Sequence, residues 1–65
     1  MEDFIQRVIN EQKELEEKTT KLGAFLLTEK YQELEPEMRL LLAQQSAFMG
    51  GYNMILKRRI DLLTN

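Results

Sequence analysis

Residues 40–63 read LLLAQQSAFMGGYNMILKRRIDLL, and two heptad rows run through this stretch and the residues just before it. One row is apolar throughout and consists of Leu42, Met49, Leu56 and Leu63. The other row begins apolar and then turns polar, and it consists of Met38, Gln45, Tyr52 and Arg59. Two rows at this spacing form a seam against which another helix packs. The stretch therefore predicts a long helix whose seam carries three polar groups.

The part of the chain before this stretch predicts a second long helix and a connector. Residues 2–27 are rich in strong helix formers, and their apolar side chains recur at steps of three and four residues. Residues 28–36 form the expected connector. Within it, the hydroxyl of Thr28 can cap a short helical turn over residues 29–34, because it can accept a backbone N–H.

Pro36 is the only proline, and proline suits the first turn of a helix. The C-terminal helix is therefore expected over residues 37–63. Because a short connector makes two helices antiparallel neighbours, the whole chain, residues 1–65, is expected to form one all-α domain, an antiparallel two-helix hairpin.

The chain has 65 residues, no cysteine and no histidine. A domain of this size buries only roughly 60% of its unfolded surface, and such domains usually rely on disulfides, metal ions or oligomerisation. The composition excludes disulfides, and no metal or cofactor is expected. Because two helices cannot enclose a core, we expect the hairpins to assemble into a homo-oligomeric helical bundle, and we favour a tetramer.

The composition also argues against several classes of function. A net charge of −2 disfavours a protein that coats nucleic acid. No apolar run approaches the roughly 20 residues that span a membrane, and the absence of cysteine fits the cytoplasm. An enzyme is not expected, because the carboxylates lack a histidine, cysteine or serine–base partner, and no glycine-rich phosphate loop is present.

Folding the hairpin about residue 32 brings polar residues of the two helices together. Thr19 then meets Gln45, and Gln12 meets Tyr52, so the polar positions of the first helix fall opposite the polar row. One interpretation is that the row only fixes register or oligomeric state, as single polar residues do in coiled coils. The other interpretation is a ligand site between protomers.

The side chains of this candidate site suit a nucleotide. The ring of Tyr52 can stack on a base, and the guanidinium of Arg59 can pair with a phosphate through two hydrogen bonds. Lys18 and Thr19 can hold a phosphate oxygen, although Lys18 can equally belong to a solvated charged face.

The pair Gly50 and Gly51 lies in the middle of the expected C-terminal helix, where each glycine costs about 1 kcal/mol relative to alanine. The pair favours close helix packing across an oligomer interface. The alternative is the close approach of a ligand to the backbone.

A set of positions in both helices resembles a known family, and it consists of Leu15, Lys18, Thr19, Lys21, Leu22, Leu41, Leu42, Gln45, Met49, Tyr52, Ile55, Leu56 and Arg59. This pattern resembles the small helical-hairpin proteins of bacteriophages of the crAss-like type. Those proteins are similar to the phage sponge proteins that sequester cyclic nucleotide signals of host defence, such as the anti-CBASS proteins. The sponges are compact helical oligomers with ligand pockets between protomers.

The resemblance implies a cyclic nucleotide, such as a cyclic dinucleotide, held between protomers in the host cytoplasm. Tyr52 would stack on a base, Arg59 and Lys18 would hold phosphates, and Gln45 and Thr19 would supply hydrogen bonds. The rival hypothesis is a module that binds a host or phage protein through its exposed apolar faces, with the polar row acting only on register.

Overall fold

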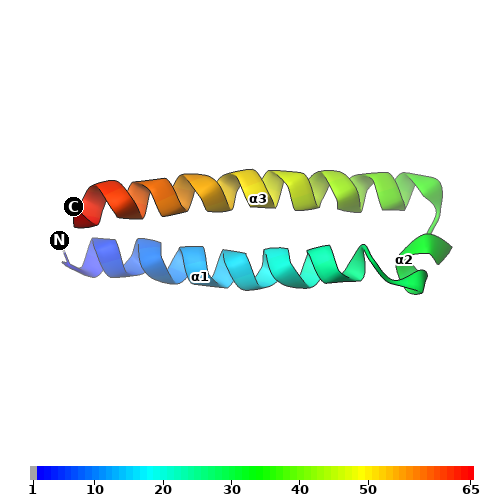
Figure 1. Ribbon diagram of the computed structural model, residues 1–65, viewed down its shortest axis with the longest axis horizontal. Coiled ribbons are helices and arrows are strands. Elements are labelled where there is room, and N and C mark those ends of the chain that lie inside the picture. Colours follow the sequence, from blue (N-terminus) through cyan, green and yellow to red (C-terminus); the bar gives the residue numbers. More distant parts are fainter. Residues whose placement is uncertain (1) are drawn as a thin grey trace.

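The computed structural model describes residues 2–65, with the exception of the side chain of Glu2. The helices are α1 (Glu2–Phe25), α2 (Glu29–Glu33) and α3 (Pro36–Thr64). The long helices α1 and α3 lie side by side and antiparallel, and the short α2 closes the end opposite to the two termini (Figure 1). The described residues contain helices and no strand, so the expected all-α class is confirmed. Met1, the first residue of the expected domain, lies outside the described residues.

The ends of the helices differ from the expected ends by one or two residues, because the connector has its own hydrogen bonds. α1 ends at Phe25 rather than at residue 27, since the Thr28 hydroxyl donates to the Phe25 carbonyl (2.7 Å). The same oxygen accepts the backbone N–H of Tyr31 (3.2 Å) and so caps α2, as the sequence predicts. α3 begins with Pro36 in its first turn.

Tyr31 ties the α2 end of the hairpin to both long helices. Its ring packs edge-on against Phe25 of α1, with the ring centroids 6.1 Å apart. Its hydroxyl donates a hydrogen bond to the backbone carbonyl of Arg39 in α3 (2.8 Å). These contacts fix where α3 starts relative to α1, and therefore the register of the hairpin at this end.

The core is a narrow seam between α1 and α3. Val8 and Leu56 are almost fully buried there, at 3% and 0% exposed. The buried amides of Gln12 and Asn53 lie in the same seam, and the Gln12 Nε2 donates to the Asn53 Oδ1 (3.1 Å). The seam side of α3 also includes half-buried residues at the same spacing, and these are Leu42, Ser46, Met49, Ile60 and Leu63.

One of the two heptad rows expected in this seam is correct and the other is wrong. The apolar row that contains Met49 and Leu56 faces α1. Its partner row is not that of Gln45 and Tyr52 but the row one residue later, which contains Asn53. Gln45, Tyr52 and Arg59 are exposed, so they do not lie between the two helices of one chain. Gln12 accordingly meets Asn53 and not Tyr52.

The glycine pair is not explained by packing within the chain. A Cβ added at Gly50 or at Gly51 would meet no atom within 4 Å. Neither glycine is therefore required for the approach of α1 to α3, and the expected close packing across an oligomer interface stays a prediction.

Candidate functional site

The polar row that was expected to face α1 belongs to a second heptad pattern, which runs along one side of α3 next to the row that α1 covers. We name this pattern the α3 stripe, and it consists of Met38, Leu41, Gln45, Phe48, Tyr52, Ile55, Arg59 and Leu62. All of these residues are exposed; Phe48 is 77% and Tyr52 is 44% exposed. Alternate steps of three and four residues are those of a helix seam. α3 therefore has one seam covered by α1 and another that no described residue covers.

The middle of the α3 stripe forms an open groove with an apolar lining. Its walls are Leu41, Gln44, Gln45, Phe48, Met49 and Tyr52. The Gln45 amide makes only a weak contact inside the chain, 3.7 Å from Nε2 to the Met49 sulfur, so its polar atoms remain open to a ligand. The groove thus combines a half-exposed phenol, an amide and apolar walls. Leu41 and Phe48 also line the groove. In the sequence, Leu41 follows Met38 by three residues and Phe48 follows Gln45 by three, and this spacing indicates that they share a helix face with the polar row.

The polar residues of the stripe are nevertheless far apart within one chain. Tyr52 follows Gln45 by two helical turns, and Arg59 follows Tyr52 by two more. At 1.5 Å per residue, Gln45 and Arg59 are separated by about 21 Å along α3. A single small ligand on one hairpin cannot contact both of them.

Thr19 and Lys18 of α1 have different environments. Thr19 is half-buried, and its hydroxyl donates to the Leu15 carbonyl (2.7 Å), so its proton is already used inside the helix. Its lone pairs can still accept a hydrogen bond. Lys18 is exposed and can reach an anion outside the helix.

The seam between α1 and α3 opens to solvent along two long edges of the hairpin, which we call its rims. Lys18 lies on the same rim as the polar row of Gln45, Tyr52 and Arg59. The ion pair between Lys57 Nζ and Glu16 Oε1 (2.8 Å) marks the opposite rim. Because a helix turns by about 100° per residue, Lys18 lies about 160° around α1 from Glu16, and Tyr52 lies about 140° around α3 from Lys57. Glu11, one heptad before Lys18, lies on the same rim, which therefore carries both signs of charge.

The opposite rim contains the only titratable group with a clear shift among the described residues. The ammonium of Lys57 and the Nδ2 of Asn53, which donates to Glu16 Oε1 (3.4 Å), both stabilise the carboxylate of Glu16. They hold the pKa of Glu16 below its ordinary value. This rim thus has a fixed ion pair that ties α1 to α3, which is a structural role.

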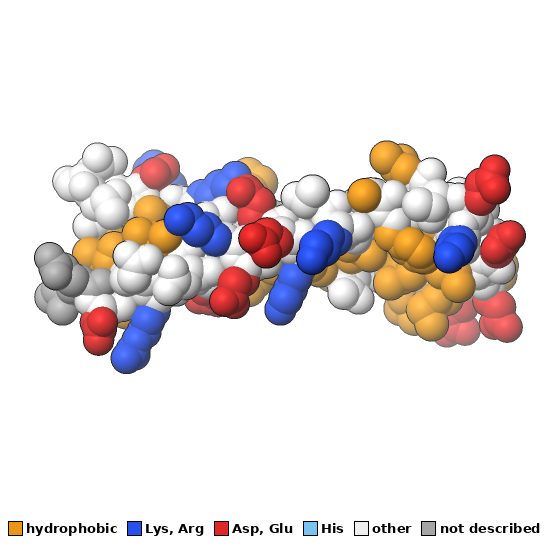
Figure 2. All heavy atoms as spheres, turned by 90° about the horizontal axis from the view of Figure 1, so that it is seen from below, with side chains coloured by type: hydrophobic (Ala, Val, Ile, Leu, Met, Phe, Trp, Pro, Cys, Tyr) orange, Lys and Arg blue, Asp and Glu red, His pale blue; other side chains and the backbone are white. Residues whose placement is uncertain are grey.

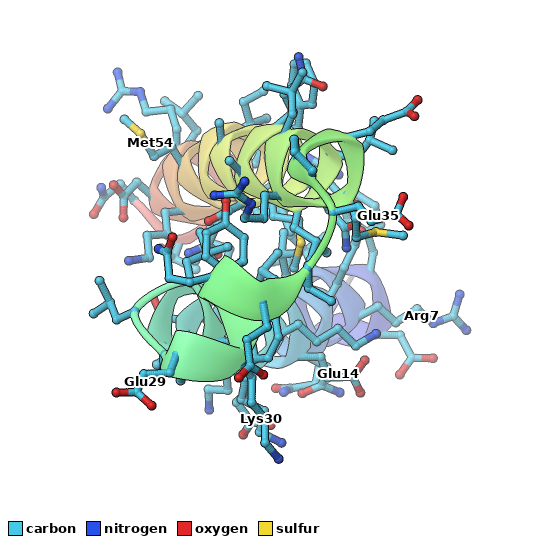
Figure 3. All side chains as sticks on the ribbon, turned by 90° about the vertical axis from the view of Figure 1, so that its right-hand side faces the viewer. Arg7, Glu14, Glu29, Lys30, Glu35 and Met54 are labelled. Atoms are coloured by element: carbon cyan, nitrogen blue, oxygen red, sulfur yellow. The ribbon has the colours of Figure 1, made fainter. Side chains whose placement is uncertain are left out.

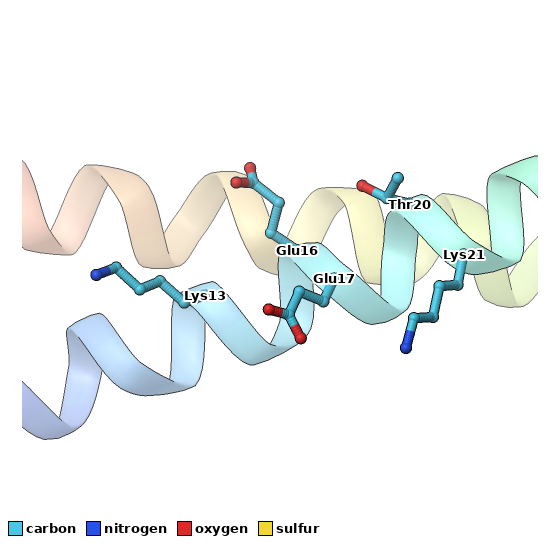
Figure 4. Close-up of a pocket in the computed structure, with 5 residues that line it drawn as sticks. All are labelled: Lys13, Glu16, Glu17, Thr20 and Lys21. Carbon is cyan, nitrogen blue, oxygen red and sulfur yellow. The ribbon is translucent and has the colours of Figure 1, made fainter.

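A second hollow lies on α1 and carries no converging set of polar groups. It is lined by Lys13, Glu16, Glu17, Thr20 and Lys21. Figure 4 shows these side chains pointing in different directions, with Lys13 and Lys21 diverging. The view from below shows the same mixture of charges along the middle of the molecule, while hydrophobic side chains gather towards the α2 end (Figure 2). The hollow is an ordinary charged helix surface.

The described residues contain no cluster of carboxylates that could hold a metal ion. Among the same residues, no helix has the length and apolar character needed to cross a membrane.

Comparison with known proteins gives one result. The family model described as Sequestin matches residues 2–62, which is almost the whole chain. The chain belongs to the Sequestin family. This family name is that of a sequestering protein, so the expected relationship to sponge proteins is confirmed. No curated protein and no solved structure gives a significant match.

Proposed function

We propose that this Sequestin binds a cyclic nucleotide signal of host antiphage defence and withholds it from the host effector. The observation that carries the proposal is the half-exposed ring of Tyr52 in an apolar groove that the Gln45 amide also lines. An aromatic face and a hydrogen-bonding amide on one surface suit a nucleobase, because stacking accepts any base and an amide can read its edge. The family name supports a sequestering role.

The proposed contacts assign one task to each residue of the site. Tyr52 stacks on a base, and Gln45 bonds to the edge of that base or to the ribose. Arg59 and Lys18 hold phosphates, Arg59 by its planar fork and Lys18 as a point charge. Thr19 accepts a hydrogen bond from the ligand, because its own proton is held by Leu15.

Sequestration needs binding and no reaction. The protein would act in the cytoplasm of an infected host cell in amounts comparable to those of its ligand. A homo-oligomer, with a tetramer favoured, would hold the ligand between protomers, since Gln45 and Arg59 of one chain are too far apart for one small ligand.

Calorimetric titration with a panel of cyclic di- and trinucleotides and their linear counterparts tests this proposal. At least one cyclic member should bind the wild type and raise its melting temperature, because a ligand of the native state stabilises it by mass action. Tyr52→Ala should weaken binding by about 1–3 kcal/mol, whereas Tyr52→Phe should retain most of it. Absence of binding across the panel contradicts the proposal.

Charge variants on the same rim separate phosphate binding from general effects of charge. Arg59→Met should abolish binding of the anionic ligand, and Glu11→Gln should strengthen it by removing a carboxylate from that rim. Lys13→Met is the control, because Lys13 is an exposed cation of α1 that lies about 140° around the helix from Lys18, away from that rim. An equal loss of affinity in Lys13→Met and Arg59→Met would show nonspecific attraction.

The exposed apolar residues of the α3 stripe also favour a second candidate, a module that binds another protein. In that case Phe48→Glu would abolish capture of the partner, and no member of the nucleotide panel would bind. Binding of a cyclic nucleotide at a ratio of one per pocket would exclude this candidate as the main function.

A further inference from the structure

We infer that the α3 stripe is the interface with a second copy of this chain, which packs its own α3 antiparallel to the first about a two-fold axis level with Gly50. The ligand site that this interface would complete rests on the proposed function, whereas the interface itself does not. The starting observation is that the stripe is a complete heptad seam without a cover, from Met38 to Leu62. Its length is about 36 Å, so its occupant is a helix as long as α3.

The stripe is complementary to itself in the antiparallel orientation. In antiparallel pairs of helices, each residue of one heptad row faces a residue of the other row. With the axis level with Gly50, Phe48 faces Tyr52 of the second copy, which pairs two aromatic rings at the centre of the interface. At the two ends, Met38 faces Leu62 of the second copy. A two-fold interface requires this kind of self-complementarity.

Charges beside the stripe agree with the antiparallel orientation. Glu37 and Arg58 occupy the row that flanks the stripe on the side away from α1. In the register set by Phe48 and Tyr52, Glu37 is level with Leu63 of the second copy, which is five residues or about 7.5 Å along the axis from Arg58. The two opposite charges are therefore close enough to attract each other, and the symmetry repeats this pair at the other end. A parallel pairing would instead bring the two copies of Arg59 together, and like charges repel. Charge therefore selects the antiparallel dimer and a partner that carries the same sequence.

The dimer assembles the polar residues that one chain keeps apart. Gln45 of the second copy lies opposite Ile55, at a level between Tyr52 and Arg59 of the first copy. Lys18 of the second copy lies at the level of its own Gln45, on the rim that it shares with the polar row. Tyr52 and Arg59 from one copy and Gln45 and Lys18 from the other then fall within about 10 Å along the helix axis. Each dimer has two such sites, and neither is complete without both copies.

Light scattering on the purified chain without ligand tests the interface. The wild type is expected to have the mass of a dimer or of a multiple of it. Phe48→Glu should give a monomer, and Met54→Glu should not change the mass. Met54 is a matched control, because it is 73% exposed and projects from the outer side of α3, off the stripe (Figure 3). A monomeric wild type, or equal effects of the two variants, would overturn the inference.

Charge reversal tests the orientation. Glu37→Arg and Arg58→Glu are each expected to weaken dimerisation about tenfold, since each replaces two attractive pairs by two repulsive ones. The double variant should return to within about threefold of the wild type. If the effects of the two reversals simply add, Glu37 and Arg58 do not pair between copies.

Because the chain has no cysteine, introduced thiols give an independent test that does not depend on the stability of the variants. A mixture of Met38→Cys and Leu62→Cys chains should form a disulfide-linked dimer, because the two positions face each other and a disulfide needs Cα atoms within about 7 Å. Either chain alone should not crosslink, since equivalent positions lie about 36 Å apart in the antiparallel dimer. Crosslinking of each variant with itself would show a parallel pairing and overturn the inference.

Failure of this inference is distinguishable from failure of the proposed function. A dimer that binds no member of the nucleotide panel retains the interface and removes the nucleotide site. A wild type that binds a nucleotide as a monomer retains the function and removes the interface. If both hold, the monomeric Phe48→Glu variant should lose nucleotide binding together with dimerisation.

Discussion

Gln12 and Asn53 place two amides in the middle of an otherwise apolar seam. The hydrogen bond between them satisfies part of the hydrogen-bonding capacity of each amide, and Asn53 also donates a hydrogen bond to Glu16 on the rim. An apolar pair would fill the same space without any requirement for alignment, whereas the amide pair bonds in one register only. The register role expected of a polar row is thus performed by a different row.

Removing one amide from this pair should destabilise the hairpin more than removing both. Gln12→Leu or Asn53→Leu leaves a buried amide without its partner, at a cost of about 1–3 kcal/mol. The double variant should recover most of that loss, because two leucines pack in the seam. Urea denaturation at one fixed protein concentration measures the coupling. Costs that add without recovery would show that the two amides do not act as a pair.

The ion pair of Glu16 predicts an effect of acid on stability. Its pKa is lowered by Lys57 and Asn53, so the carboxylate binds a proton less readily in the folded chain than in the unfolded one. Its stabilising contribution is present above the ordinary glutamate pKa of about 4.3 and is lost as the pH falls through the lowered pKa. Glu16→Gln should remove this part of the acid dependence, which melting curves between neutral and acid pH can measure.

Glu17→Gln is the control for this measurement, because Glu17 is an exposed neighbour on α1 for which the structure gives no cross-helix contact. It should leave the acid dependence as in the wild type. The same loss in both variants would mean that general surface charge and not the Glu16 pair causes the effect.

At the scale of the elements, α1 was predictable and α3 was only partly so. α1 places its apolar residues mainly on one face, while α3 is apolar on two faces. From Leu42, the heptad pattern continues equally well through Gln45 or through Ser46, and periodicity alone cannot choose between them. The choice depends on the bond between Gln12 and Asn53, which are 41 residues apart.

The shared row of the candidate site residues was predictable, but the direction in which that row faces was not. Tyr52, Gln45 and Arg59 do share one row, as the heptad spacing requires, and that row faces the solvent instead of α1. The short α2 was predictable, because its cap depends on Thr28 alone. The difference is general: local hydrogen bonds are visible in the sequence, whereas the pairing of two faces depends on distant residues.

Gly50 should tolerate a side chain. A Cβ there would meet no atom within 4 Å, and alanine is favoured over glycine inside a helix by about 1 kcal/mol. Gly50→Ala should therefore stabilise the chain by up to about 1 kcal/mol in urea denaturation without a change of oligomeric mass. A destabilised Gly50→Ala variant would show that a neighbouring chain approaches the backbone there. Such an approach is the close helix packing that the glycine pair predicts from the sequence.

At the scale of the whole molecule, the hairpin has a thin core for its size. Only two hydrophobic residues, Val8 and Leu56, are buried among the described residues, and a larger number of large apolar side chains face the solvent. Such a chain should gain much of its stability from self-association. Its melting temperature should rise with protein concentration, because the assembled state is favoured by mass action.

The Phe48→Glu variant supplies the control for this prediction. Its melting temperature should be lower than that of the wild type and independent of concentration. Scanning calorimetry over a hundredfold range of concentration measures both effects. A wild type with a constant melting temperature would mean that the hairpin is stable alone.

The α2 end of the hairpin forms a corner in which the Tyr31 hydroxyl bonds to the Arg39 carbonyl, and this corner has a consequence for the order of folding. That bond closes a segment of eight residues, while the Gln12–Asn53 bond closes one of 41. Since the entropy lost on closing a loop rises with its length, the corner should form first and the helices should then zip towards the termini. In stopped-flow kinetics of the monomeric variant, Phe25→Leu should slow folding, whereas Val8→Ala should mainly accelerate unfolding.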